Sequence, residues 1–199
     1  MRIVLATNNK GKIRELQALL SPLNMEVLPK SQFTSDEVAE TGVTFMENAL
    51  IKARHAAQAS GLAAIADDSG IEVDALHGAP GIYSARYAGE GASDEDNLNK
   101  LLSVMSNVPE HLRTARYKCA LAYVRSIDDP HPLCCEATWE GSITRAPLGE
   151  GGFGYDPIFW LPEYQQTSAQ ISAELKNQLS HRAKALQQLI SLLRASESR

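Results

Sequence analysis

The sequence predicts an α/β protein built on a mixed sheet. Strand and helix patterns alternate along the first half of the chain, which is typical of α/β folds. Two strand patterns then follow one another around residues 117–123 and 133–139, which favours a mixed sheet over a purely parallel one. The 199 residues, 44% of them hydrophobic, are enough to fill the core of a single domain spanning residues 1–199.

The first predicted strand covers residues 3–6 and ends in a polar, glycine-containing loop. A helix follows, because apolar residues recur at helical spacing in Ile13, Leu16, Leu19 and Leu20. After a polar connection, Thr44 and Glu47 have the spacing of a capping box, which predicts the start of a second helix. The face of that helix expected to turn inward carries Met46, Leu50, Ala53 and Ala57.

Residues 62–66 read as a buried strand, and 67–70, Asp-Asp-Ser-Gly, as a turn. Ile71, Val73 and Ala75 then alternate as a strand does. Residues 78–87 are rich in glycine and proline and are expected to be mostly loop.

Ser93 can cap a helix that carries Leu98, Leu101, Leu102 and Met105. The strand patterns at 117–123 and 133–139 are expected to pair across a turn at residues 128–130, Asp-Asp-Pro. Ser180 precedes the last predicted helix, whose inward face carries Leu186, Leu189, Ile190 and Leu193.

Charge and segment composition exclude several classes of protein. A formal charge of −5 argues against holding nucleic acid by counterion release, which needs a basic face. The short apolar start does not make a secretory signal, and no segment approaches the roughly 20 apolar residues of a membrane span. We therefore expect a soluble, cytoplasmic protein with no nucleic-acid or membrane partner. The three cysteines lack the spacing of a zinc site or a disulfide framework, so buried thiols are expected.

The segment Thr7-Asn8-Asn9-Lys10-Gly11-Lys12 lies where the first strand gives way to a helix. Backbone N–H groups and two lysines converge there at a helix N-terminus, which is a setting that binds phosphate. The spacing is not that of a Walker loop. An ordinary capped helix with solvated lysines would explain this segment equally well.

Asp67 and Asp68 place two carboxylates next to each other, and neighbouring residues of an extended chain point opposite ways. One of them could hold magnesium or accept a proton from water, although a turn is the simpler interpretation of the segment alone. Asn48 and Lys52 share a helix face, with Glu40 just upstream. These three could bind metal and phosphate, but a solvated helix face also accounts for Asn48 and Lys52.

Residues 150–157, Glu-Gly-Gly-Phe-Gly-Tyr-Asp-Pro, hold two aromatic rings and a carboxylate among glycines. An aromatic ring can stack on a nucleobase, although the same rings could simply plug a turn into the core. Further donors gather near the last helix in Lys176 and in the run Ser180-His181-Arg182, where helix capping is the alternative.

Taken in order, five separated segments closely resemble the Ham1/RdgB family of inosine triphosphate pyrophosphatases, also called XTP/dITP diphosphatases. The resemblance covers essentially the whole chain. The opening Thr7-Asn8-Asn9-Lys10-Gly11-Lys12 matches the pattern [ST]-x-N-x-x-K of that family. The other four are Glu40-Thr41-Gly42 with the helix up to Lys52, Asp67-Asp68-Ser69-Gly70, Gly152-Phe153-Gly154-Tyr155-Asp156-Pro157 and Ser180-His181-Arg182.

The resemblance implies an ITPase-like (Maf/Ham1) α/β fold with two lobes that flank a central active-site cleft, working as a homodimer. It implies Mg²⁺ as the cofactor, Asp68 as proton acceptor and metal ligand, and Glu40 as a second metal contact. The substrate-binding positions that it implies are Thr7, Asn8, Asn9, Lys10, Gly11, Lys12, Asn48, Lys52, Ser69, Phe153, Gly154, Tyr155, Asp156, Lys176, His181 and Arg182. Of the two aromatic residues, Phe153 is expected to stack on the base and Tyr155 to be structural.

The implied reaction converts ITP, dITP or XTP to the monophosphate and pyrophosphate. Magnesium and lysines would neutralise the phosphates, and Asp68 would activate the water. Lys176 or Arg182 could donate to the keto oxygen that adenine lacks, which would discriminate against ATP. A phosphatase that removes only the terminal phosphate, or a nucleotide sensor without catalysis, could use the same loop and carboxylates.

Overall fold

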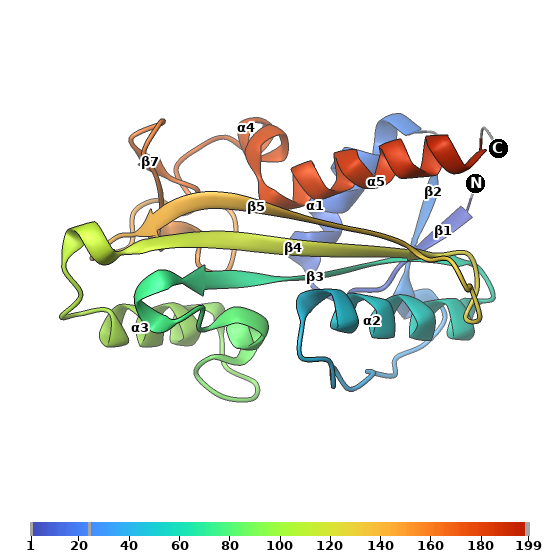
Figure 1. Cartoon of the computed structure of the whole chain (residues 1–199), viewed down its shortest axis with the longest axis horizontal. Helices are drawn as coiled ribbons and strands as arrows, with labels where there is room; N and C mark the ends of the chain where they lie inside the picture. The colour runs from blue at the N-terminus through green and yellow to red at the C-terminus, as the bar shows by residue number, and fades with distance from the viewer. Residues whose placement is uncertain (1, 24, 198–199) are drawn as a thin grey trace. The chain divides into compact units, whose positions relative to one another are not determined.

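The computed structural model describes residues 2–23 and 25–197. Over these residues the strands form one sheet of seven, in the order β2-β1-β3-β4-β5-β6-β7 (Figure 1). The strands are β1 (Arg2–Leu5), β2 (Glu26–Pro29), β3 (Ala63–Val73), β4 (Thr114–Val124), β5 (Leu133–Ile143), β6 (Phe159–Leu161) and β7 (Gln166–Thr167). The short strands β2, β6 and β7 have no expected counterpart, because two to four residues carry too little alternation to be recognised.

The predicted mixed α/β fold is confirmed. β1 pairs in parallel with both β2 and β3, with Ile3 opposite Val27 and Ala63. The pairs β5–β6 and β6–β7 are antiparallel. The helices are α1 (Lys10–Leu20), α2 (Phe45–Ser60), α3 (Asp94–Val104), α4 (Ala173–Leu179) and α5 (His181–Glu197). All but the short α4 were expected.

The chain divides into two compact units. Unit 1 comprises residues 1–68, 119–137 and 182–199, and unit 2 comprises 69–118 and 138–181. The expectation of a single domain over residues 1–199 remains a prediction, as does the arrangement of two lobes about a cleft.

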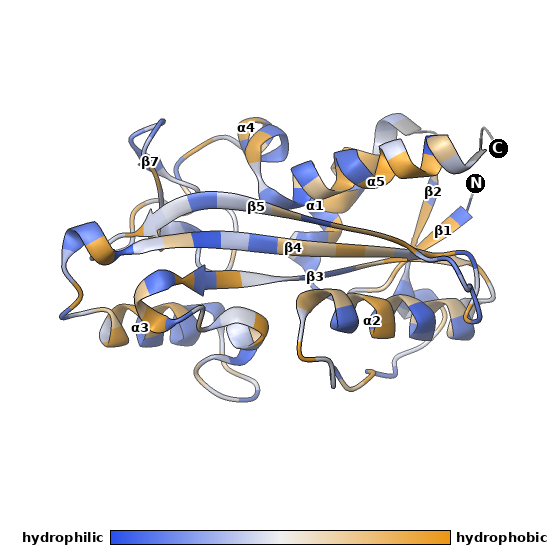
Figure 2. Cartoon of the chain, in the orientation of Figure 1, coloured by the Kyte–Doolittle hydropathy of each residue, from blue (hydrophilic) through white to orange (hydrophobic). Residues whose placement is uncertain are grey.

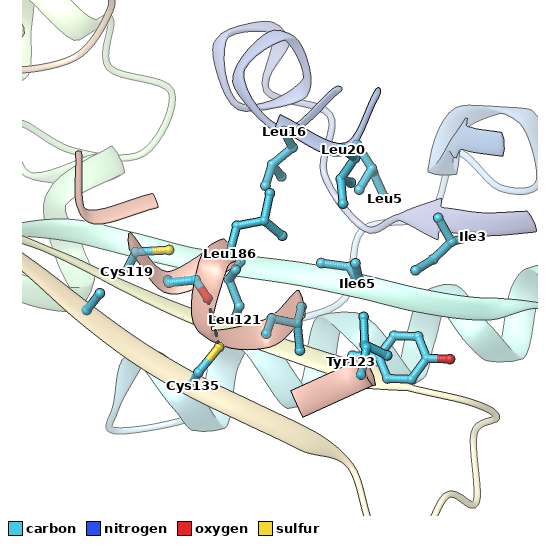
Figure 3. Close-up of a cluster of buried hydrophobic side chains, with 14 residues drawn as sticks. Ile3, Leu5, Leu16, Leu20, Ile65, Cys119, Leu121, Tyr123, Cys135 and Leu186 are labelled. Atoms are coloured by element: carbon cyan, nitrogen blue, oxygen red, sulfur yellow. Dashed lines mark hydrogen bonds between the residues drawn. The ribbon is translucent and has the colours of Figure 1, made fainter. Parts of the chain in front are cut away.

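In unit 1, α1 and α5 lie on one face of the strands and α2 on the other (Figure 1). Leu16 of α1 and Leu186 of α5 pack in one buried cluster with Ile65 and Leu121 of the sheet (Figure 3). Because both faces are covered, β1 is almost wholly buried and hydrophobic, whereas α2 and α5 alternate between polar and apolar residues (Figure 2).

Unit 2 has a separate buried cluster, made by α3 and the strand segments of this unit. Its members are more aromatic than those of unit 1 and include Tyr117, Trp139, Tyr155 and Phe159. The ring centroids of Tyr117 and Phe159 lie 4.5 Å apart in a tilted arrangement, which is favourable for an aromatic pair.

The turn expected at residues 67–70 is wrong, because these residues continue strand β3 without a break. Aspartate favours turns by bonding its own backbone. Here the carboxylates of Asp67 and Asp68 bond to lysine and arginine side chains instead. Gly70 serves close packing, because an added Cβ would overlap the hydroxyl of Ser84 and the carbonyl of Gly81.

Three further expectations need correction. The segment 78–87 is less irregular than its glycines indicated, because Gly81–Arg86 form a 3-10 helix. Thr44 caps α2 as expected, but the carboxylate of Glu47 accepts from the N–H of Val43 and not from that of the cap residue. The buried face of α2 is also shifted from the expected one and consists of Phe45, Asn48, Ala49, Ala53, Ala56 and Ala57.

Cys119 and Cys135 are buried, as expected for core thiols, and Cys134 is half-buried. The Sγ of Cys135 donates to the carbonyl of Ala185 at 3.1 Å (Figure 3). Within residues 2–23 and 25–197, we find no helix that is both long and apolar enough to cross a bilayer.

The connection between β4 and β5 predicts a pH-dependent stability. Buried Asp129 accepts from the N–H groups of Arg125 and His131 at 2.8 and 3.0 Å. Burial alone would raise the pKa of Asp129, but these N–H groups and the Arg125 guanidinium outweigh it and lower the pKa below its ordinary value. We expect Asp129→Ala to lower the free energy of unfolding by about 2 kcal/mol at neutral pH.

Because the pKa is lowered on folding, this contribution is present above the ordinary aspartate pKa and is lost as the pH falls through the folded value. Urea unfolding of wild type and Asp129→Ala at neutral pH and near pH 3 should therefore show the difference shrinking in acid. Asp129→Asn, which keeps an acceptor oxygen, is the matched control. An equal difference at both pH values would contradict the assignment.

Candidate functional site

The loop after β1 is organised by its own polar side chains. Asn9 is the cap of α1, and its side-chain oxygen accepts from the N–H groups of Gly11 and Lys12 at 2.9 and 3.1 Å. The N–H of Asn9 donates to the hydroxyl of Thr7 at 3.2 Å. This is the capped helix that was the alternative interpretation of the segment, and Lys10 is exposed as that interpretation requires.

Lys12 does not fit the picture of solvated lysines. Its ammonium lies 2.5 Å from a carboxylate oxygen of Asp67, and its side chain is only 15% exposed. The buried Asp67 carboxylate therefore holds the Lys12 ammonium in one position at the start of α1. The loop therefore has a fixed positive charge beside its backbone N–H groups.

Asp67 is the centre of a buried charge cluster in unit 1. Its second carboxylate oxygen accepts from the Nε of Arg182 at 2.9 Å and from the Sγ of Cys119 at 3.0 Å. Arg182 also bonds Glu15. Burial would raise the pKa of Asp67, but the charges of Arg182 and Lys12 outweigh it and hold the pKa well below its ordinary value. Asp67 is therefore ionised and fully engaged.

Asp68 differs from its neighbour although both are buried. One of its carboxylate oxygens bonds the Lys52 ammonium at 2.7 Å. The other, Oδ2, is buried and has no hydrogen-bond partner among the described residues. Burial raises the pKa of Asp68 in spite of the Lys52 charge. A buried carboxylate with an unused acceptor is a candidate for binding a cation or receiving a proton.

Glu40 shares Lys52 with Asp68. The Lys52 ammonium lies 3.1 Å from a carboxylate oxygen of Glu40, and Lys52 is mostly buried. Burial would lower the pKa of Lys52, but the two carboxylates outweigh it and raise the pKa, so the ammonium stays charged. Two carboxylates thus converge on one cation in unit 1.

The solvated helix face considered for Asn48 and Lys52 is wrong. Asn48 is completely buried, and its side-chain oxygen accepts from the N–H of Gly42 at 2.8 Å. This bond fixes the segment that leads from Glu40 into α2. A further contact on this approach joins Asn8 to Glu37, and Glu37 also lies 3.6 Å from the buried Lys30.

In unit 2, Phe153 lies in a loop between two glycines with positive φ, Gly152 at 72° and Gly154 at 61°. This conformation suits glycine because it has no Cβ. The Phe153 ring is half-buried, and the Lys176 ammonium lies 4.9 Å from its centroid. The Phe153 ring and the Lys176 ammonium therefore lie next to each other in unit 2.

Asp156 holds this loop in place. Its Oδ2 accepts from the Lys176 ammonium at 2.6 Å and from the N–H of Phe153 at 2.9 Å. Its Oδ1 accepts from the hydroxyls of Ser168 and Tyr117 at 2.8 and 3.1 Å. Asp156 is therefore an internal acceptor whose oxygens are used by the protein itself.

Tyr155 is buried, and its hydroxyl donates to the carbonyl of Ser84 at 2.7 Å. Burial raises the pKa of Tyr155. These contacts agree with the expectation that Tyr155 is structural. His181 is buried against the ring of Tyr117, with the centroids 4.7 Å apart and the planes nearly parallel.

The expected site residues thus fall into two groups. Unit 1 contains Thr7 to Lys12, Glu40, Asn48, Lys52, Asp68 and Arg182, and unit 2 contains Ser69, Phe153 to Asp156, Lys176 and His181. Arg182, expected to contact substrate, is engaged by Asp67 and Glu15. The motifs did not indicate several residues that form hydrogen bonds within these two groups, because a partner distant in the sequence leaves no local signal. These residues are Glu15, Glu37, Tyr117, Cys119 and Ser168.

Residues 3–192 match the model of the Ham1 family. The chain belongs to the Ham1 family. A dITP/XTP pyrophosphatase of Vibrio parahaemolyticus is 60% identical over 194 residues, covering 98% of this chain and 97% of the relative. A dITP/XTP pyrophosphatase of Escherichia coli is 53% identical over 193 residues, covering 97% and 98%.

The Ham1 fold is also that of the similar solved structures. A HAM1 protein from Coxiella burnetii superposes with a TM-score of 0.89 at 45% identity, covering 98% of this chain and 99% of that one. The Staphylococcus aureus Ham1 protein gives 0.86 at 43% identity, covering 98% and 100%. The resemblance inferred from five motifs is therefore confirmed over nearly the whole chain.

Proposed function

We infer that this Ham1 protein hydrolyses non-standard purine nucleoside triphosphates, namely ITP, dITP and XTP, to the monophosphate and pyrophosphate. This activity removes abnormal nucleotides from the pool before they enter DNA or RNA. The curated relatives at 53% to 60% identity carry the name dITP/XTP pyrophosphatase. The observation that carries the assignment to residues is the buried Asp68, with one oxygen on Lys52 and the other without a hydrogen bond among the described residues.

We propose that unit 1 handles the triphosphate. The loop Thr7 to Lys12 offers the fixed charge of Lys12 and the exposed Lys10, and Lys52 adds a further ammonium. Phosphate oxygens accept hydrogen bonds and are attracted to such charges. Asn9 shapes the loop through its bond to the N–H of Gly11, Asn8 and Lys10 lie in the same loop as further phosphate-binding residues, and Asn48 fixes the approach of Glu40.

Glu40 and Asp68 fit a magnesium ion. Mg²⁺ in nucleotide enzymes uses one or two carboxylates and takes its other ligands from water and phosphate. The pair of carboxylates around Lys52 has this character. Within the described part of the chain, no cluster of three or more acidic, histidine or cysteine side chains is arranged to hold a metal ion. When bound, the ion would neutralise charge on the phosphates.

In the reaction, a water oxygen attacks the α-phosphorus and the bond from that phosphorus to the bridging oxygen breaks. The bond's electron pair leaves with pyrophosphate, and the water proton passes to Asp68. The unused oxygen and the raised pKa of Asp68 suit it to accept this proton. Lys52 holds the other oxygen and so orients the carboxylate.

We propose that unit 2 recognises the base. Phe153 would stack on the purine, and Lys176 beside it would donate to the keto oxygen that hypoxanthine and xanthine have and adenine lacks. Bound ATP would leave the Lys176 donor without an acceptor, and such a missing hydrogen bond strongly favours hypoxanthine and xanthine over adenine. Gly154 and Asp156 shape the loop, and Tyr155 anchors it through the bond from its hydroxyl to the Ser84 carbonyl. We assign Ser69 and His181 as further substrate-binding positions of this unit. Arg182 is better placed to hold Asp67 than to meet the base.

We also propose that the protein is a cytoplasmic homodimer without nucleic-acid or membrane partners. The formal charge of −5 is unfavourable for binding a polyanion. Light scattering at micromolar concentration measures the oligomeric state directly, and a monomer would refute the dimer.

The activity is tested by incubating the protein with Mg²⁺ and ITP, dITP, XTP, ATP or GTP and measuring phosphate with and without added inorganic pyrophosphatase. Phosphate from the first three nucleotides that requires the coupling enzyme is the expected result. Phosphate without it would instead identify a terminal phosphatase, and no product would indicate a binding protein. A chelator should abolish turnover, and added Mg²⁺ should restore it.

A further inference from the structure

The first turn of α3 contains a carboxylate that the helix does not need for its own cap. Ser93 is the cap residue, and its hydroxyl accepts from the N–H of Asp96 at 3.1 Å. The Asp96 carboxylate accepts in return from the N–H of Ser93 at 2.9 Å, which completes the capping box. Asp94, the first residue of the helix, is therefore available for another partner.

That partner is the loop around Phe153. The Oδ2 of Asp94 accepts from the N–H of Gly154 at 2.8 Å, across 60 residues of sequence. The preceding N–H, that of Phe153, donates to Asp156 at 2.9 Å. Two successive N–H groups on either side of the Phe153 α-carbon are thus each held by a carboxylate. Since the flanking glycines have no side chains to pack, such backbone contacts restrict the loop.

The same start of α3 is tied to a second segment. Asn97 lies one turn after Asp94, and its side chain accepts from the N–H of Ala88 at 2.7 Å and donates to the carbonyl of Ala85 at 3.1 Å. The Tyr155 hydroxyl donates to the neighbouring carbonyl of Ser84. The helix start, residues 84–88 and the loop at 152–156 are therefore joined in a closed set of hydrogen bonds within unit 2.

We propose that Asp94 is a positioning residue that fixes the orientation of the Phe153 ring for stacking on the purine base. The proposal rests on the proposed function, in which Phe153 is the stacking residue. Asp94 acts through the Gly154 N–H and needs no contact with substrate. Without this acceptor the loop samples more conformations, and binding of the base must restrict them again. Contacts of the phosphates in unit 1 do not depend on this bond.

The test compares Asp94→Ala with wild type using two ligands, dITP as substrate and inorganic tripolyphosphate as an inhibitor without a base. Loss of one exposed hydrogen bond is expected to raise the KM for dITP about fivefold while kcat changes little. The inhibition constant of tripolyphosphate should stay within about twofold of wild type. Because the capping box remains, the variant is expected to keep α3, which thermal unfolding checks.

Two further variants sharpen the test. Asp94→Asn keeps an acceptor oxygen and should restore a KM close to that of wild type, whereas Glu95→Ala removes the same charge from the same turn and should change nothing. Amide hydrogen exchange at Gly154 should become faster only in Asp94→Ala.

Three results would each overturn the proposal. They are an unchanged KM for dITP in Asp94→Ala, an inhibition constant for tripolyphosphate that rises as much as the KM, and a KM for Asp94→Asn as high as that for Asp94→Ala. A wild-type protein that hydrolyses none of ITP, dITP and XTP would instead refute the proposed function, so the two failures are distinguishable.

Discussion

Asp68→Asn is expected to lower kcat for dITP by about 10³-fold, within the range that a general base contributes. Asparagine retains an oxygen for Lys52, so the bond that orients the side chain can persist. It cannot accept a proton, and the buried position of Oδ2 becomes an amide that offers hydrogen atoms to the attacking water. The defect should therefore fall on turnover more than on binding.

Steady-state kinetics with the pyrophosphatase-coupled assay would measure this loss, together with direct binding of dITP. Asp128→Asn is the matched control, since it makes the same replacement at an exposed aspartate of unit 1 and should leave kcat and KM unchanged. If Asp68→Asn retained more than about a tenth of wild-type kcat, some other group would have to accept the proton.

Asp67→Asn should destabilise the protein by about 3 to 5 kcal/mol, because it leaves two largely buried cations without their shared carboxylate. The side chain of Asp67 is completely buried between Lys12 and Arg182, and Glu15 then remains as the counter-charge of Arg182. For a chain of this length, the loss corresponds to a decrease in Tm on the order of 10 °C. Urea and thermal unfolding would measure it.

The double variant Asp67→Asn with Lys12→Met separates the effect of the unpaired charge from that of packing. Removing Lys12 takes away one of the stranded cations, so the double variant should be less destabilised than the sum of the two single variants. Additive losses, or a destabilisation below about 1 kcal/mol for Asp67→Asn alone, would show that the cluster is not a coupled set of charges.

These two predictions assign a catalytic role to Asp68 and a stabilising role to Asp67. The sequence indicates that the two aspartates differ but does not indicate which has which role. Alternation in an extended chain indicates that Asp67 and Asp68 point to opposite sides. Which of the two carboxylates has both oxygens occupied by protein donors depends on Arg182, more than a hundred residues away, and on Lys12 and Cys119. Local propensity instead favoured a turn at 67–70, and it was overridden because these distant charges satisfy the carboxylates within a continuous strand.

Elements with strong periodicity were predicted well. The helices that start after Asn9, Thr44, Ser93 and Ser180 carry both a polar start signal and an apolar stripe, and the structure has all four. The strands β2, β6 and β7 and the helix α4 were not recognised, because they are short and their formation depends on neighbouring elements. The same holds for Asp94, whose partner Gly154 is adjacent only in the folded chain.

By itself the sequence determined the α/β class, the principal helices and strands, and membership of the Ham1 family, because periodicity, caps and ordered motifs are properties of the chain read locally. Only the tertiary structure decided which of the motif residues are occupied by other protein groups and which keep unused polar atoms. Asp67, Asp156 and Arg182 belong to the first kind, and Asp68 to the second. The physical reason is that the state of a buried charge depends on the partners that folding brings to it, and those partners are distant in the sequence.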